Sequence, residues 1–310
     1  MTAIAASDGL APDVRESGYW RDAWHTLSRD WTAMLGAAIV VALVLAALLA
    51  PLVAPHDPAD QLREGLTDDG SPIGPSGAFL FGTDPLGRDE LSRILSGARV
   101  SLAVGVGANL LAAVFAIAVG GTAGMAGRLL QTLLMRLADI ILSFPILLLA
   151  IALLAVANPN LLSIVLIVGI GFGAYLARIV FAQVVSLRER EFITAARSAG
   201  VGSTWILIRH VIPHVLPSIL VFVALGIATA IQLEAALSYV GIGIRPPEAS
   251  WGNMINEGQQ YLRTSPWLVA FPGGAIMLTM LGFGLLGDGL RDALDPSLER
   301  RTRLLGFGIR

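Results

Sequence analysis

Six apolar stretches, each long enough to cross a membrane, constrain the fold of this chain more than any other feature. A transmembrane helix needs about 20 apolar residues to cross the hydrocarbon layer. In lipid, only helices and closed barrels satisfy all of their backbone hydrogen bonds. We therefore predict an all-α, polytopic membrane protein with six transmembrane helices. The stretches cover residues 33–54, 102–125, 137–157, 161–185, 215–242 and 268–286.

Composition supports this prediction and excludes several functions. Charged residues make up 14% of the chain, against roughly a quarter in soluble domains. There is no cysteine, so disulfides and thiolate metal sites are excluded. All 21 basic residues are arginine, and a P-loop needs a lysine to reach the nucleotide phosphates. The chain therefore carries no standard P-loop ATPase, and no basic tract suggests nucleic acid.

The distribution of arginine predicts the orientation. With the N-terminus inside, fourteen arginines lie in cytoplasmic segments and six in outer loops, as the positive-inside rule requires. Both termini are then cytoplasmic. We expect the protein to lie in the plasma (inner) membrane. The predicted parts are a cytoplasmic tail (1–32), a first span with a long extracytoplasmic loop (33–100), a core transmembrane domain (101–290) with a cytoplasmic loop at 187–214, and a cytoplasmic C-terminal tail (291–310).

The N-terminal tail has two interpretations. The stretch around Trp20, Trp24 and Leu27 is amphipathic, and Trp31 is placed as an aromatic belt residue. In the first interpretation, this amphipathic stretch lies at the membrane interface. The polar composition of the first thirty residues is equally compatible with an unstructured tail.

The most informative stretch is the cytoplasmic loop after the fourth span. Phe192, Ala195, Ala196 and Ala199 recur with helical spacing, and this small, alanine-rich face would let a partner's backbone come close. Gly200 follows as a C-terminal stop, because glycine adopts the left-handed conformation without penalty. We expect Ser203 to cap a second short helix over 204–212, which Pro213 ends. The alternative is an amphipathic helix lying on lipid headgroups.

Residues 191–219 resemble the EAA loop of ABC importer permeases, a coupling helix that docks into a cleft on the ATPase subunit. Ala195, Ala196 and Gly200 match the family pattern, and the ending 215–217 (Val-Leu-Pro) is close to it. Thr194 stands where the family has glutamate, although Glu191 lies one turn earlier. The resemblance implies a coupling role for Arg190, Glu191, Thr194, Ala195, Ala196, Gly200 and Ser203.

Further stretches resemble the C-type permeases of the dipeptide, oligopeptide and nickel branch. They are residues 81–101, 209–217, 237–254 (with Pro246 and Pro247) and 287–296. The resemblance implies a type I ABC importer permease fold with no catalytic residue and no cofactor of its own. ATP and Mg would be bound by two ATP-binding partner subunits. A second homologous permease would complete a heterodimer, and an extracytoplasmic binding protein would deliver peptides.

Polar residues in the other segments are candidates for the transport path. The resemblance makes Arg88, Asp89, Trp251 and Asn253 candidates for an extracytoplasmic gate or a binding-protein contact. A charge inside a span is costly, so it faces the bundle or an interface. Glu234, with Thr229 and Gln232 on the same span, would line the pathway or the partner permease. The alternative for Glu234 is a hydrogen bond that fixes helix packing.

Other charged and titratable residues favour structural roles. Asp139 and Arg178 lie near predicted cytoplasmic ends, which favours a packing role over a pathway role. The four histidines show no convincing metal-ligand spacing, since Pro213 stands between His210 and His214. We predict no metal site.

Two other classes compete with the permease hypothesis. An ion-coupled secondary transporter tends to show inverted repeats and broken helices, and the sequence has no clear internal repeat. A membrane-embedded enzyme would need paired carboxylates or a nucleophile–base arrangement, and the spans show none at catalytic spacing. Nickel or another small ligand is the alternative to a peptide substrate.

Overall fold

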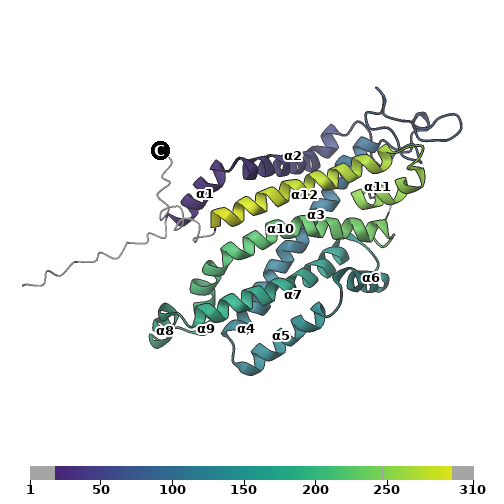
Figure 1. The fold of residues 1–310 in the computed structure, drawn as a ribbon. Coiled ribbons are helices and arrows are strands. Elements are labelled where there is room, and N and C mark those ends of the chain that lie inside the picture. Colours follow the sequence, from purple (N-terminus) through teal and green to yellow (C-terminus); the bar gives the residue numbers. More distant parts are fainter. Residues whose placement is uncertain (1–17, 246–247, 295–310) are drawn as a thin grey trace, which may run out of the picture.

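The computed structural model describes residues 18–245 and 248–294. Within these ranges the chain is helical, with two isolated β-bridges and no β-strand. Figure 1 shows the long helices running side by side in an elongated bundle. The predicted tails fall partly outside the described residues, at 1–17 and 295–310, as do Pro246 and Pro247.

Among the described residues, five helices are long and apolar enough to cross a membrane. Three are single α-helices: α2 (Trp31–Val53), α7 (Leu161–Arg188) and α12 (Trp267–Leu294). The other two each contain one π-helical turn, namely α3 (Glu90–Ala116), η2 (Ile117–Gly121) and α4 (Thr122–Met125), and α9 (Ser203–Ile206), η3 (Leu207–Val211) and α10 (Ile212–Tyr239).

The third predicted span is not one continuous helix. It consists of α5 (Arg128–Leu142) and α6 (Ile146–Ala157), which are bent by 88° at the break between them. Pro145 lies at this break as the N-cap of α6. Proline disfavours the helical conformation of the residue before it, so α5 ends at this point. Counting the bent pair as one span gives the predicted six.

The second helix of the hairpin differs from the prediction. Gly202 is the N-cap of α9, and Ser203 is its first residue and makes no capping bond. The helix also does not end at Pro213, because it continues through η3 and α10 to Tyr239. Pro213 lies in the first turn of α10, where the missing N–H of proline is tolerated. The hairpin is therefore a direct extension of a span.

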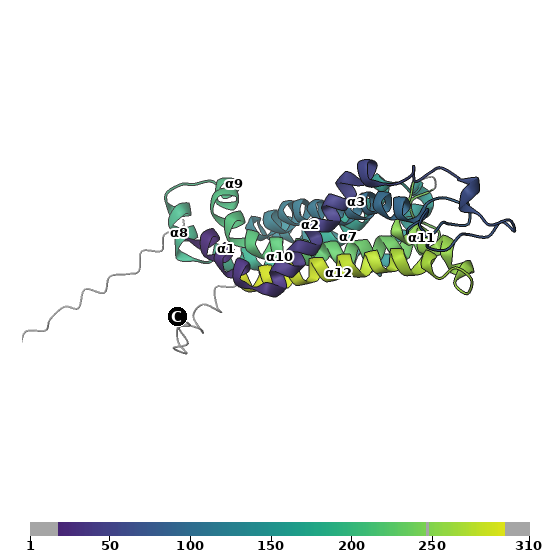
Figure 2. The ribbon, with the colours of Figure 1, turned by 90° about the horizontal axis from the view of Figure 1, so that it is seen from above.

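The two ends of the bundle are built differently (Figures 1 and 2). One end, here called the hairpin end, carries α8 (Glu191–Ser198), α9, α1 (Tyr19–Arg29) and the last turn of α12. The opposite end carries the loop 54–89 and α11 (Trp251–Gly258), which together are called the cap. Since α1 is a helix that packs on α12, this part of the predicted tail is structured.

Glycines allow the long helices to approach closely. A Cβ at Gly120 would overlap the backbone of Ala177, and one at Gly169 would lie 2.9 Å from the carbonyl oxygen of Ala108. Gly36 in α2 faces the backbone of α12 in the same way. Lipid provides no hydrophobic force between helices, so such contacts hold the bundle together.

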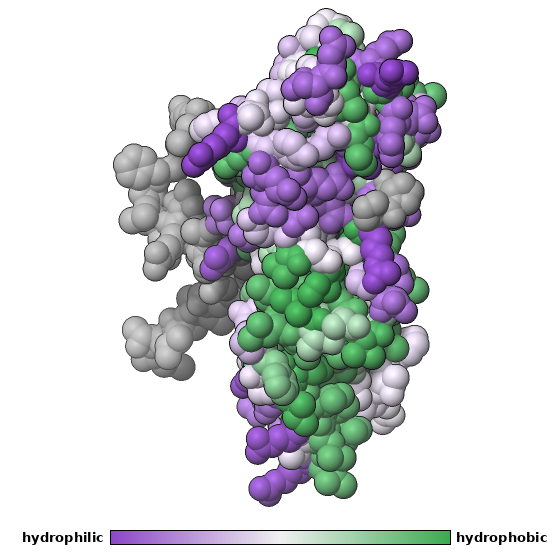
Figure 3. All heavy atoms as spheres, turned by 90° about the vertical axis from the view of Figure 1, so that its right-hand side faces the viewer, coloured by the Kyte–Doolittle hydropathy of each residue, from purple (hydrophilic) through white to green (hydrophobic). Residues whose placement is uncertain are grey.

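Hydrophobic side chains also cover much of the outside of the bundle. Figure 3, seen from the cap end, shows hydrophilic residues in its upper part and a hydrophobic surface below them. Leu148, Leu153 and Val156 of α6 are among the exposed apolar side chains. A surface of this kind suits contact with lipid.

Candidate functional site

The hairpin formed by α8 and α9 is attached to the bundle by one face of α8. Ile193 is fully buried and Ala196 is half-buried, and both pack in a cluster with Ile206 and Val184. Ala195 and Ala199 are exposed, and Phe192 is exposed but partly covered by His214 of its own subunit. Ala196, which the sequence placed on the docking face, therefore contacts its own subunit. The exposed face of α8 presents small side chains in its middle, and the packed cluster lies behind it.

Gly200 ends α8 in the conformation predicted from the sequence. Its φ is +83°, which lies in the left-handed region. The N–H of Val201 donates to the carbonyl of Ala196 at 3.1 Å, and the N–H of Gly200 donates to that of Arg197 at 2.9 Å. This pair of bonds is a Schellman motif. It fixes the direction in which the chain leaves α8 toward α9.

The polar side chains of α8 differ in whether they bind their own helix or are exposed. The hydroxyl of Thr194 donates to the carbonyl of Arg190 at 3.3 Å, so this side chain is folded onto its own helix. Glu191 is exposed in the first turn. Phe192 stacks on His214 with ring centroids 5.4 Å apart. Glu191 is therefore the exposed carboxylate of α8.

The hairpin is linked to two spans through paired π turns. A Cβ at Gly121 of η2 would lie 3.4 Å from Leu207 Cδ1 of η3, so the two turns are in contact. Leu207 also packs in the cluster that contains Ile193 and Ile206. π-Helical turns are rare and often lie at functional sites. A displacement of α8 would therefore reach both α3 and α10.

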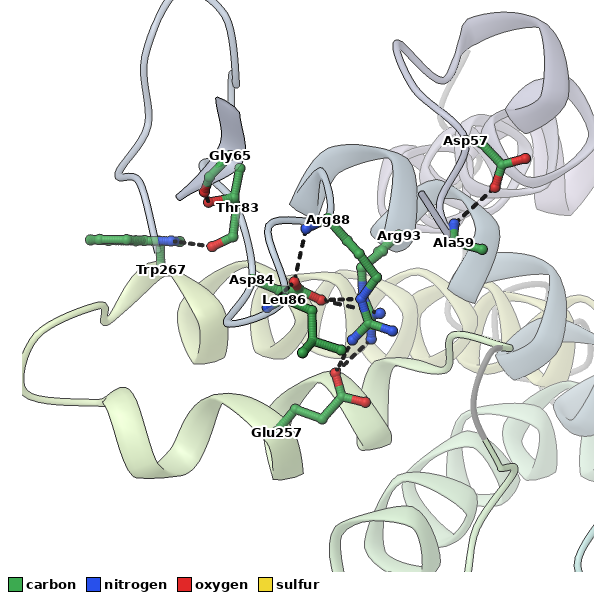
Figure 4. Close-up of polar contacts among 10 residues, drawn as sticks. All are labelled: Asp57, Ala59, Gly65, Thr83, Asp84, Leu86, Arg88, Arg93, Glu257 and Trp267. Atoms are coloured by element: carbon green, nitrogen blue, oxygen red, sulfur yellow. Dashed lines mark hydrogen bonds and ion pairs between the residues drawn. The ribbon is translucent and has the colours of Figure 1, made fainter. Parts of the chain in front are cut away.

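At the other end, four charged side chains join the loop of the cap to α11 (Figure 4). Arg88 pairs with Asp84 at 2.5 Å and with Glu257 at 2.9 Å. Arg93 pairs with the same two carboxylates, at 3.2 and 2.8 Å. Arg93 is 1% exposed, and buried charges are stable only when they are paired in this way. The network fixes α11 against the start of α3.

Two of the predicted gate residues, Arg88 and Asp89, are buried in this region. Arg88 belongs to the charge network, and Asp89 caps α3 by accepting from the N–H and the hydroxyl of Ser92 at 2.9 and 2.6 Å. Their side chains are therefore occupied within the subunit and form no surface for a binding protein. The physical reason is that a buried charge must be neutralised by its nearest partners.

The other two predicted gate residues also have partners inside the chain. The indole N–H of Trp251 donates to the carbonyl of Ile94 at 3.1 Å, and Trp251 is buried. The side-chain amide of Asn253, which is half-buried, donates to the carbonyl of Ile244. Trp251 and Asn253 thus help to hold α11 inside the subunit, and their role at a gate or a binding-protein contact stays a prediction.

Glu234 is separated from the two residues that were grouped with it. It is fully buried and accepts from Ser238 at 2.7 Å and from Ser101 of α3 at 3.1 Å. These contacts correspond to the alternative, in which the carboxyl group fixes helix packing. Thr229 and Gln232 are exposed on another face of α10, where they are free to face a pathway or a partner.

The remaining charged candidates have structural partners. Arg178 pairs with Asp139 at 3.4 Å, and this pair is solvent-accessible at the surface of the chain. The ring nitrogen Nδ1 of His214 lies 2.6 Å from the backbone oxygen of His210. In the described part of the chain, no group of three potential metal-ligating side chains could hold an ion.

Two segments of the chain match known families of membrane transport proteins. Residues 116–300 match the family described as binding-protein-dependent transport system inner membrane component. Residues 18–67 match the N-terminal transmembrane domain of oligopeptide transport permease C. The chain belongs to this family of ABC importer permeases. It is a multi-pass membrane permease and not an enzyme.

Several curated permeases are similar over nearly the whole chain. A dipeptide transport system permease protein of Alkalihalophilus pseudofirmus is 40% identical over 90% of both chains. An oligopeptide transport system permease protein of Bacillus subtilis is 37% identical over 96% of both. A glutathione transport system permease protein of Salmonella typhimurium is 39% identical over 90% of this chain and 91% of the relative.

The cap of the permease contains a residue of the charge network that the sequence did not single out. This residue is Glu257, which neutralises two arginines that precede it by 169 and 164 residues. The motif at residues 81–101 contains Asp84, Arg88 and Arg93 but gives no indication of their partner. A buried arginine signals that a carboxylate is near, and only the folded chain identifies it.

Proposed function

We propose that this permease forms half of the translocation pathway of an ATP-driven importer of di- or oligopeptides. Membership in the family of peptide and glutathione importer permeases supports the general function. The names of the relatives support a short peptide as the substrate, since they specify dipeptides, oligopeptides and glutathione. A second, homologous permease would supply the other half of the pathway.

The observation that carries this proposal is the exposed face of α8. Ala195 and Ala199 form a small surface, and the opposite side of the same helix is locked into the core through Ile193. Such a surface admits a partner's backbone and transmits a push, because the packed cluster behind it is nearly incompressible. An ATP-binding subunit that moves α8 would move α3 and α10 with it.

The partner subunits would provide what this chain lacks. Its sequence has no lysine and therefore no standard P-loop, so two ATP-binding subunits would hold ATP and Mg. They would lie at the hairpin end, which we assign to the cytoplasm together with both termini. An extracytoplasmic binding protein would deliver the peptide at the cap end.

The proposed docking can be tested by cross-linking, because the chain has no cysteine and an introduced one is unique within this subunit. Ala195→Cys lies on the proposed docking face. Arg197→Cys is the matched control, because two residues rotate a helix by about 200°. In the assembled transporter, a bifunctional reagent should join position 195 to an ATP-binding subunit. A cross-link from position 197 alone would contradict the proposed face.

A transport assay separates this function from ion-coupled transport. Uptake of a labelled dipeptide into vesicles should require internal ATP and should persist when ionophores collapse the ion gradients. Uptake driven by a proton gradient without any ATPase would overturn the proposal. Orientation is tested in the same vesicles, since an impermeant maleimide should reach Asp68→Cys from outside and Ala195→Cys only from inside.

A further inference from the structure

Arg99 reaches across from α3 to the backbone of α2. Its Nε donates to the carbonyl oxygen of Ala47 at 2.6 Å, and its NH2 group donates to that of Leu48 at 3.1 Å. Carbonyls inside a helix normally have a partner four residues later. A guanidinium that binds two of them therefore calls for an explanation in the sequence of α2.

Pro51 provides this explanation. It lies inside α2, four residues after Ala47, and proline has no backbone N–H to donate. The carbonyl of Ala47 therefore lacks its normal partner within the helix. Ala47 is buried, and an unpaired polar group in such a place is costly. Arg99 supplies the missing donor from a neighbouring helix.

The arginine gains from the same arrangement. It lies nine residues after the start of α3, beside the last turns of α2. A charged side chain in a membrane-spanning helix is costly unless it finds acceptors. The carbonyl of Ala47, which Pro51 leaves without its helical donor, is such an acceptor. The two residues thus satisfy each other across the helix pair.

A second contact on the same face of α3 holds the chain beyond Pro51. The hydroxyl of Ser92 accepts from the backbone N–H of His56 at 3.1 Å. Ser92 and Arg99 are seven residues apart, so they lie on one face of α3. Arg99 binds the chain before Pro51, and Ser92 binds the chain after it. The start of the cap loop is therefore fixed to α3 on both sides of the proline.

We propose that Arg99 is a positioning residue, which holds the end of α2 on α3 by satisfying the carbonyl that Pro51 leaves without a partner. In this way it sets where the cap begins. The cap loop then carries Arg88, which is paired with Asp84, to its contact with Glu257 of α11. Arg99 thereby acts on the cap through α2, without contacting the transported molecule.

The test is a pair of substitutions whose effects must depend on each other. Arg99→Met removes the donors, whereas Pro51→Ala restores the N–H that Ala47 needs. In the full-length chain in lipid nanodiscs, a nitroxide at Leu52→Cys reports the mobility of this end of α2. Leu52 is 83% exposed, and the chain has no other cysteine, so the probe is unique and causes little disturbance.

We expect Arg99→Met to increase the mobility of the probe at least twofold. Losing a charge-assisted hydrogen bond should shift the equilibrium between the attached and the detached end of α2 by about tenfold, so peptide uptake by the assembled transporter should fall. Pro51→Ala alone should change neither signal. The double variant should regain most of both signals. Arg178→Met, which removes an exposed arginine that pairs with Asp139, is the control and should be insensitive to Pro51→Ala.

Two results would overturn this proposal. One is an unchanged nitroxide spectrum in Arg99→Met, and the other is a change that Pro51→Ala does not reverse. If Arg99→Met fails to insert, the double variant still decides, because restored insertion would require the proposed link. The probe signal needs neither substrate nor ATP, so it is independent of whether the protein imports peptides.

Discussion

The backbone N–H of Val201 donates to the carbonyl oxygen of Ala196 at 3.1 Å, closing the turn that ends α8. This bond connects the first residue after the turn to the half-buried side of the proposed coupling helix. It can form only when Gly200 between them is left-handed, with φ at +83°. The geometry of the hairpin thus depends on one residue without a side chain.

Gly200→Val should leave membrane insertion intact and abolish substrate-stimulated ATPase activity of the assembled transporter. A left-handed residue with a side chain costs about 1–2 kcal/mol, and more when it is β-branched. The turn would therefore open and α8 would change direction. Gly202→Thr is the matched control, because Gly202 has an extended backbone at an N-cap position, which suits threonine. Normal stimulation in Gly200→Val would contradict the coupling role.

Arg93→Met should lower the free energy of unfolding by about 3–5 kcal/mol, the usual cost of removing one partner from a buried ion pair. It would leave Asp84 and Glu257 with Arg88 as their remaining cation in the network. Denaturation of the purified permease in detergent measures this change. Arg178→Met should cost about 0–1 kcal/mol, because its pair with Asp139 is exposed. Equal losses in the two variants would show that the network adds no stability.

Gly36→Ala should destabilise the contact between α2 and α12. A Cβ at position 36 would lie 2.6 Å from the backbone nitrogen of Leu286 and 2.8 Å from the oxygen of Gly282. Overpacking of this kind costs about 1–3 kcal/mol, and backbone atoms cannot rotate away. Gly284→Ala in α12 meets no atom within 4 Å and should stabilise the helix by about 0.5–1 kcal/mol. Thermal denaturation in detergent should therefore shift in opposite directions.

Variants of Glu234 should distinguish a packing role from a pathway role. If the carboxyl group fixes packing through Ser101 and Ser238, Glu234→Gln should preserve both uptake and stability, because the amide still accepts hydrogen bonds. Glu234→Ala should then lose about 1–3 kcal/mol, since two buried hydroxyls lose their acceptor. A pathway role predicts the reverse, with uptake lost in both variants and thermal stability retained.

Much of the fold follows from local sequence. The apolar stretches predict the spans, and Gly200 predicts the stop of α8, because each property depends on a few neighbouring residues. Predictions based on proline were less accurate. Pro145 lies at a break in the predicted third span, whereas the helix that Pro213 was expected to end continues past it. A proline removes one N–H in each case, and its position relative to a helix start decides the effect.

The candidate site could be predicted at one end of the molecule and not at the other. The hairpin is a local structure, so its alanines and glycine reveal it. The cap is held together by contacts between residues far apart in the chain, such as Arg93 with Glu257. Arg88, Asp89 and Trp251 therefore looked like surface residues although they are buried. Burial of a polar side chain depends on partners that spacing along the chain does not reveal.

By itself, the sequence determined that this protein is a helical membrane protein with a protruding hairpin, because hydrophobic length and glycine conformation are properties of short segments. The tertiary structure alone decided which polar groups are exposed. Glu234 lies inside the bundle, Arg99 satisfies a carbonyl of another helix, and one face of α8 stays free. Each outcome depends on how separate helices pack, since a buried polar group is stable only where a distant part of the chain supplies its partner.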